Sequence, residues 1–99
     1  MRGLSVGAVM AALLLSGAAS AADEMQALLP LCSSCHGAAG VSVAPNFPNL
    51  AGQRDVYLRK QLQDFRSGAR KDPVMSPVAA GLTDAQIEAA VRYYTGQKP

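Results

Sequence analysis

The chain has 99 residues, nine Lys and Arg against seven Asp and Glu, and 49% hydrophobic residues. This length accommodates one small domain. The near balance of charges argues against nucleic acid or a strongly charged membrane surface as the partner, because both require a concentrated basic surface.

The first 22 residues predict a cleaved secretory signal peptide. Arg2 supplies the positive start, 4–15 is an apolar run, and 16–22 is rich in small residues. The alternative, an uncleaved membrane anchor, requires about 20 apolar residues, more than this run provides. We expect cleavage after Ala21 or Ala22, and export to the periplasm.

The remaining domain, residues 23–99, would contain 77 residues. A domain of this size buries only about 60% of the surface of its unfolded chain and is marginally stable alone. Such domains usually depend on a disulfide, a metal or a cofactor. We therefore expect the domain to fold poorly without an additional group.

The first predicted helix of this domain covers residues 23–31. It starts with two acidic residues, which the helix macrodipole favours at an N-terminus. Met25, Leu28 and Leu29 then form an apolar stripe at helical spacing. Pro30 predicts that the helix ends or kinks there, with a further turn carrying the next residues, because proline removes a helical hydrogen bond.

Two more helices are expected, and no segment predicts a strand. Leu58, Leu62 and Phe65 are spaced as one helical face within 55–67, and Gly68 follows as a stop signal. The segments 37–52 and 69–82 are rich in Gly and Pro and predict loops, the second with at most one helical turn.

The last predicted helix begins after Thr83 and ends at Gly96. Thr83 and Gln86 have the spacing of a capping box, in which each side chain bonds to the other residue's backbone N–H. The apolar stripe of this helix consists of Ile87, Ala90, Val91 and Tyr94.

The sequence Cys32-Ser33-Ser34-Cys35-His36 is the main chemical motif. In an exported protein, C-x-x-C-H is typical of the attachment site of a c-type haem. Two thiols at this spacing can form thioethers with the two vinyl groups of one porphyrin, and the adjacent imidazole can then bind the iron. We predict one haem c, attached through Cys32 and Cys35 and ligated by His36.

Three other interpretations of the cysteines are open. They are a disulfide between Cys32 and Cys35, a thioredoxin-like redox pair, and a zinc site. The redox pair is expected in a βαβ context, and a structural zinc site takes four ligands. The chain has two cysteines and a single histidine.

The second axial ligand is predicted to be Met75. Only Met25 and Met75 lie outside the predicted signal peptide, and Met25 belongs to the apolar stripe, where methionine is a packing residue. Met75 lies in a proline-flanked loop far from the cysteines. Lys71 and an open, water-bearing site are the alternatives. Histidine and methionine together would close both axial positions and leave one-electron exchange.

From Cys32 onward, the chain resembles class I cytochromes c, and within them cytochrome c553 and the single domains of dihaem cytochrome c4. The matching stretches are CSSCHG at 32–37, PNLAGQ at 48–53, YLRKQLQDFRSGAR at 57–70 and DPVMSPVAAGLTD at 72–84.

The resemblance implies the class I helical fold, in which the first and last helices cross. It implies Met75 as the sixth ligand, and it implies that the backbone carbonyl of Pro48 accepts the second ring N–H of His36. Tyr93 or Tyr94 would pack where the helices meet. The alternative for Pro48 is a simple turn proline.

We thus expect an all-α protein, three to four helices around one covalently bound haem, that acts as a periplasmic electron carrier and not as an enzyme. The alternative is a haem-bearing subunit of a larger dehydrogenase complex, for example in sulfur-compound oxidation. Partners would be periplasmic or membrane-bound redox proteins, with no nucleic acid, no stable membrane insertion and a monomeric state. Six basic residues in mid-chain are either a solvated helix face or a docking surface for an acidic partner: Arg54, Arg59, Lys60, Arg66, Arg70 and Lys71.

Overall fold

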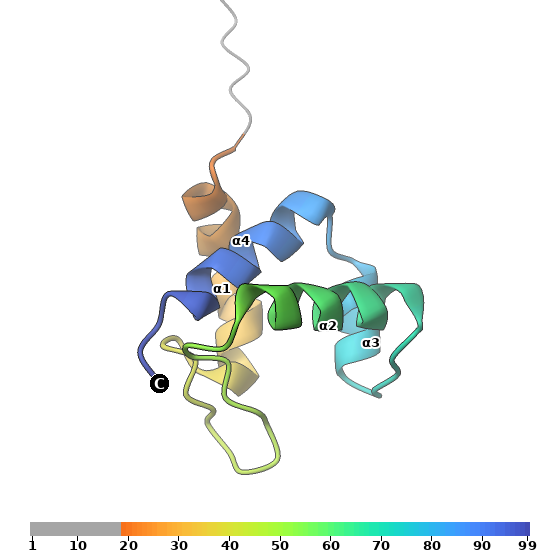
Figure 1. Cartoon of the computed structure of the whole chain (residues 1–99), viewed down its shortest axis with the longest axis horizontal. Helices are drawn as coiled ribbons and strands as arrows, with labels where there is room; N and C mark the ends of the chain where they lie inside the picture. Colours follow the sequence, from red (N-terminus) through yellow and green to blue (C-terminus); the bar gives the residue numbers. More distant parts are fainter. Residues whose placement is uncertain (1–18) are drawn as a thin grey trace, which may run out of the picture.

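A computed structural model describes residues 19–99, and within them the chain forms four helices and no strand. They are α1 (Ala21–His36), α2 (Asp55–Ser67), α3 (Met75–Ala80) and α4 (Asp84–Thr95) (Figure 1). The predicted all-α class is confirmed. Most of the predicted signal peptide lies outside the described residues. Among the residues that are described, no helix is long and apolar enough to cross a membrane.

Helix α1 is longer than predicted and runs through Pro30. Of the two predicted outcomes at Pro30, an end of the helix is wrong, and a kink stays a prediction. Proline cannot donate to the carbonyl of Gln26, four residues earlier. Gln26 and Pro30 are both exposed, so solvent can reach that carbonyl. Burial of Met25 and Leu28 on the opposite side offsets the lost hydrogen bond.

The first and last helices pack against each other, and α4 crosses α1 in Figure 1. This crossing forms most of the core, which also takes in one side of α2. The predicted stripe of α4 is buried throughout, and Met25 is a core residue with 4% exposure, as predicted. The core cluster consists of Met25, Leu28, Leu58, Leu82, Ile87, Ala89, Ala90, Val91 and Tyr94.

The predicted capping box of α4 is present. The Thr83 hydroxyl accepts the backbone N–H of Gln86 at 3.1 Å, and the Gln86 side chain accepts the N–H of Thr83 at 2.9 Å. These two bonds satisfy backbone donors that the first turn of a helix leaves unpaired. The start of α4 is therefore fixed by its own sequence.

Helix α2 has the predicted bounds and lies in front of α4 in Figure 1, where it contacts both α3 and α4. Leu58 and Phe65 are buried, and Gly68 ends the helix in a left-handed conformation with φ 88°. The segment after Gly68, predicted as a loop with at most one turn, contains the six-residue α3. Helix α3 packs on α2 and does not contact α1.

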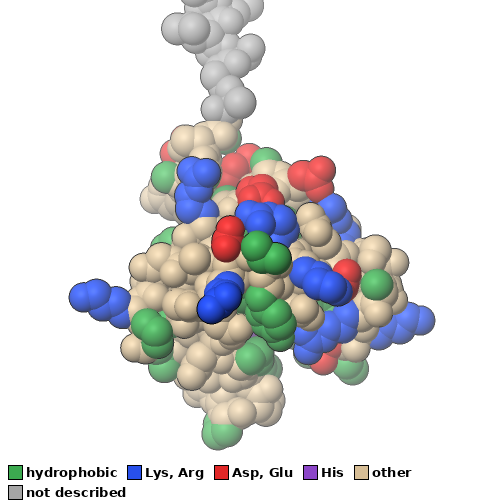
Figure 2. All heavy atoms as spheres, viewed as in Figure 1, with side chains coloured by type: hydrophobic (Ala, Val, Ile, Leu, Met, Phe, Trp, Pro, Cys, Tyr) green, Lys and Arg blue, Asp and Glu red, His purple; other side chains and the backbone are tan. Residues whose placement is uncertain are grey.

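Several of the mid-chain basic side chains are paired with acids. Figure 2 shows blue and red side chains next to each other on this face. Arg59 makes two hydrogen bonds to Glu88 of α4, at 2.5 and 2.9 Å, which raise the pKa of Arg59 and lower that of Glu88. Lys60 pairs with Asp64, and Arg66 with Asp84 at 2.6 Å. These pairings favour a solvated, ion-paired face over a basic docking surface.

We expect Ile87→Ala to lower the free energy of unfolding of the haem-loaded protein by about 2–5 kcal/mol, because it opens a cavity in the core. Ile87 is 1% exposed. Denaturant titration measures the change. The control is Val56→Ala on α2, a residue 69% exposed, which should change the free energy by no more than about 0.5 kcal/mol. Equal effects of the two substitutions would contradict the assignment of the core.

Candidate functional site

The cysteine–histidine motif occupies the last two turns of α1. Cys32 and Cys35 are free thiols, both half-buried, and they lie three residues apart on one helix, a spacing that places them on the same face. Cys32 also packs against the core, and burial raises the pKa of its thiol. Redox-active C-x-x-C pairs have lowered pKa values instead. The surroundings of Cys32 therefore do not favour a thioredoxin-like role.

The His36 ring is anchored by the backbone of a distant loop. Its Nδ1 lies 2.9 Å from the carbonyl oxygen of Pro48, and the residue is only 8% exposed. A carbonyl oxygen can only accept, so Nδ1 carries the ring proton. In the neutral imidazole, Nε2 then holds the free lone pair, as a metal ligand requires.

Gly37 allows the chain to turn sharply directly after His36. Its φ of 78° and ψ of 152° lie in a region that only glycine adopts readily. A Cβ at this position would also clash with the carbonyl oxygen of Val41. The residue that follows the motif is thus restricted to glycine for two independent reasons.

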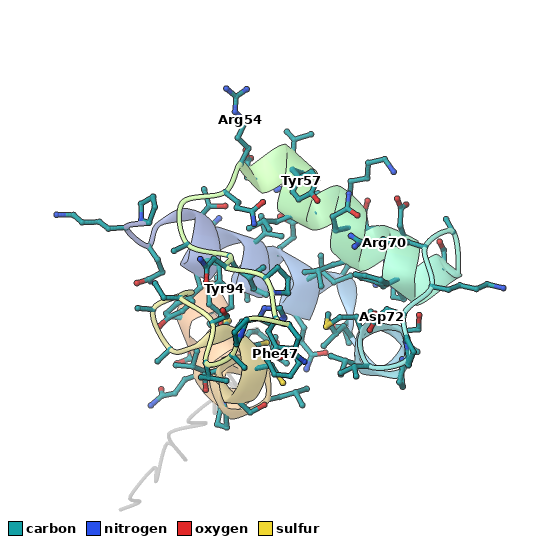
Figure 3. The ribbon with its side chains drawn as sticks, turned by 90° about the horizontal axis from the view of Figure 1, so that it is seen from below. Phe47, Arg54, Tyr57, Arg70, Asp72 and Tyr94 are labelled. Atoms are coloured by element: carbon teal, nitrogen blue, oxygen red, sulfur yellow. The ribbon has the colours of Figure 1, made fainter. Side chains whose placement is uncertain are left out.

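The loop that carries Pro48 has no regular secondary structure but is fixed by its own hydrogen bonds. The carbonyl of Gly40 accepts the N–H groups of Leu50 and Ala51, at 2.8 and 3.0 Å. The side chain of Asn49 accepts the N–H of Ser42 at 2.7 Å. These bonds connect the segment before the loop tip, 40–42, with the segment after it, 49–51. The tip between them contains Phe47. In Figure 3, Phe47 lies beside the end of α1.

Met75 is the first residue of α3 and is half-buried. Its backbone position is fixed by Asp72, labelled in Figure 3, whose carboxylate accepts the N–H groups of Val74 and Met75, each at 2.9 Å. The Ser76 hydroxyl accepts the N–H of Asp72 at 2.9 Å in return. The bonds from Met75 and Val74 lower the pKa of the Asp72 carboxyl, because they stabilise its ionised form.

Asp72 has a positioning role that our sequence analysis did not identify. The signal is present in the sequence, because an Asp followed by Pro directly before a helix is a common start signal. It was not recognised because the segment was predicted as a loop. Lys71, the alternative ligand, is exposed in the turn that precedes α3.

The structure thus gathers four of the five predicted site residues at one end of α1, namely Cys32, Cys35, His36 and Pro48. The fifth, Met75, belongs to α3, which packs on α2 and does not contact α1. A group bound by both His36 and Met75 would therefore connect two helices that do not contact each other directly.

The family model for cytochrome c matches residues 21–95 of the chain. The chain belongs to the cytochrome c family. Its relatives include the thiosulfate dehydrogenase electron acceptor of Stutzerimonas stutzeri, 46% identical over 89 residues, which are 81% of this chain and 41% of that protein. Cytochrome c4 of Pseudomonas aeruginosa is 41% identical over 87 residues, 85% of this chain and 43% of that protein.

Single-domain and structural relatives agree with this membership. Cytochrome c-554(548) of Halomonas halodenitrificans is 40% identical over 70 residues, 68% of this chain and 84% of that protein. The crystal structure of reduced cytochrome c4 from Pseudomonas stutzeri matches with a TM-score of 0.71 and 38% identity, over 82% of this chain and 47% of that one. The predicted class I cytochrome c fold is confirmed. The chain spans less than half the length of the cytochrome c4 relatives it matches.

Membership of the cytochrome c family implies a covalently bound haem c. The donor atoms present fit this group. Two half-buried thiols share one helix face, and an imidazole with a free Nε2 follows them directly. Within residues 19–99, the hydrogen-bonding partner of that imidazole is a backbone carbonyl, a common second partner of metal-bound histidine.

We expect Gly37→Ala to destabilise the haem-loaded protein strongly, and Gly68→Ala serves as the matched control. Both glycines have positive φ, but nothing lies within 4 Å of a Cβ at Gly68. Gly68→Ala should cost about 1–2 kcal/mol for the left-handed backbone alone. Gly37→Ala should cost about 1–3 kcal/mol more because of the clash with Val41. Denaturant unfolding measures the free energy of unfolding of both variants. Equal losses would show that the structure relieves the clash at Gly37 without a further loss of stability.

We expect Asp72→Ala to loosen the start of α3. The amide protons of Val74 and Met75 should exchange with solvent about fivefold faster, because each loses its acceptor. Hydrogen exchange followed by NMR measures this change. Asp72→Asn keeps a side-chain oxygen as acceptor and should stay close to the unaltered protein. Unchanged exchange in Asp72→Ala would show that the carboxylate does not hold this turn.

Proposed function

We propose that this protein is a periplasmic monohaem cytochrome c that carries single electrons between redox partners. Haem c is attached through Cys32 and Cys35, and the iron is ligated by His36 and Met75. The observation that carries the proposal is the bond from His36 Nδ1 to the Pro48 carbonyl, which leaves Nε2 free to bind a metal.

Each site residue has a defined task in this proposal. The thiols of Cys32 and Cys35 form the covalent link and hold the cofactor against the end of α1. Pro48 fixes the tautomer of His36 and strengthens it as an electron donor through the hydrogen bond. Met75 supplies a soft thioether, which raises the reduction potential relative to a second histidine.

Closed axial positions favour a carrier over an enzyme. Haem c would supply a one-electron redox couple when bound. With His36 and Met75 both ligating, the protein leaves no open position for oxygen or peroxide. The core assignment of Met25 supports Met75, because it removes the other methionine of the described residues from consideration.

The proposed location follows from the N-terminal sequence pattern, with residues 1–22 as the signal peptide and 23–99 as the mature domain. Helix α1 begins at Ala21, and the Ser20 hydroxyl accepts the N–H of Asp23 at 3.2 Å. Cleavage after Ala21 or Ala22 would therefore remove this N-cap, and the mature helix would start at its acidic residues.

A second candidate is an electron-accepting subunit of a dehydrogenase complex. Its support is the 46% identity to a protein named thiosulfate dehydrogenase electron acceptor. The redox partner would then be one enzyme that stays bound. Sedimentation of the mature protein purified from its natural host distinguishes the two functions. A free carrier sediments as a monomer, whereas a subunit sediments with its partner.

We expect Met75→Leu to abolish the far-red absorption band of the thioether–ferric bond in the oxidised, haem-loaded protein. The matched control is Met25→Leu, the same exchange in the core, which should keep the band and cost less than about 1.5 kcal/mol. Optical spectra of the oxidised and reduced forms measure both. A band that persists in Met75→Leu would exclude Met75 as the ligand. A high-spin spectrum of the unaltered protein would indicate an open iron and contradict the proposed closure of both axial positions.

A further inference from the structure

Two adjacent tyrosines at the end of α4 reach the backbone directly after His36. The hydroxyl of Tyr93 donates to the carbonyl of Ala38, and that of Tyr94 donates to the carbonyl of Gly37 at 3.2 Å. The two rings pack edge to face, with centroids 5.0 Å apart. In Figure 3, Tyr94 lies between α4 and the loop that follows α1.

The same turn of α4 also holds the far end of this loop. The backbone carbonyl of Tyr94 accepts the N–H of Gly52 at 3.1 Å. The end of α4 therefore binds the loop at its start, through Gly37 and Ala38, and near its end, through Gly52. Pro48, whose carbonyl accepts the proton of His36, lies between these two attachment points.

We propose that Tyr93 and Tyr94 are positioning residues for His36, and that their hydroxyls set the orientation of its ring through the loop. This role rests on the proposed function, because it matters only where His36 binds iron. The ring is held from two sides. On one side, the backbone of His36 continues into Gly37, whose carbonyl accepts the hydroxyl of Tyr94. On the other side, its Nδ1 donates to the carbonyl of Pro48, which belongs to the loop that α4 binds at both ends.

The hydroxyls, not the rings, are the groups that this role requires. Tyr94 is 2% exposed, and a phenylalanine would fill the same space in the core. Burial of a hydroxyl without a hydrogen-bonding partner costs free energy, so the hydroxyl of Tyr94 requires the carbonyl of Gly37 as its acceptor. Burial also raises the pKa of the Tyr94 phenol, which keeps the hydroxyl a donor at all physiological pH values.

The test uses the haem-loaded protein and the variants Tyr93→Phe, Tyr94→Phe and the double variant. The matched control is Tyr57→Phe on α2, a tyrosine 50% exposed and labelled in Figure 3, away from the loop. NMR of the reduced protein measures the exchange of the His36 Nδ1 proton with solvent. Electrochemistry measures the reduction potential.

We expect each single variant to speed this exchange by about fivefold, because each loses one hydrogen bond that fixes the loop. The double variant should speed the exchange further. The reduction potential should rise, because a weaker bond to Pro48 leaves His36 a poorer donor to the ferric iron. Tyr57→Phe should change neither quantity.

A merely structural role gives a different result. Variants that lower the melting temperature but keep the exchange rate and the potential of the unaltered protein would overturn the proposal, since the hydroxyls would then only stabilise the fold. Tyr93→Phe keeps the test decisive if Tyr94→Phe does not fold, because Tyr93 is only half-buried. An unaltered protein without histidine ligation in its spectrum would overturn the proposed function itself, and this role with it.

Discussion

The hydrogen bond between His36 and Pro48 is the constraint on which the rest of the site depends. It joins the end of a helix to the tip region of a loop without regular secondary structure. Further contacts fix the loop around this bond, through the turn at Gly37, the pairing of the segments before and after its tip, and the end of α4. The bond decides which ring nitrogen is available, so the chemistry of the site is set by backbone geometry.

The two proposed axial ligands are held in different ways. His36 is the last residue of α1, a long helix that is part of the main core. Its position is therefore fixed by the most stable part of the molecule. Met75 is the first residue of α3, a helix of six residues that packs on α2. The carboxylate of Asp72 fixes the start of this helix. Short helices with few buried residues open locally more easily than the core does. The methionine side is therefore where ligand exchange in this fold would begin.

Local signals in the sequence were enough to predict much of this fold. Helix α2 and the capping box at Thr83 depend on neighbouring residues, and both were predicted correctly. Helix α1 does not end at Pro30, one of the two predicted outcomes, because tertiary burial of Met25 and Leu28 outweighs the local cost of the proline. The chemical motif was recognised directly. The hydrogen bonds of Tyr93 and Tyr94 were not predicted, because bonds to backbone carbonyls more than 50 residues away have no sequence signature. The local bonds of Asp72 were missed because its segment was predicted as a loop.

The pairing of the first helix with the last has a consequence for the order of assembly. A chain exported from its N-terminus, as proposed here, delivers the Cys32–His36 segment before α4 has crossed the membrane. In the finished fold both thiols are half-buried, and Cys32 packs on the core that α4 completes. Translocation would thus provide an interval in which the thiols are accessible for haem attachment. Packing of α4 on α1 would then end that interval.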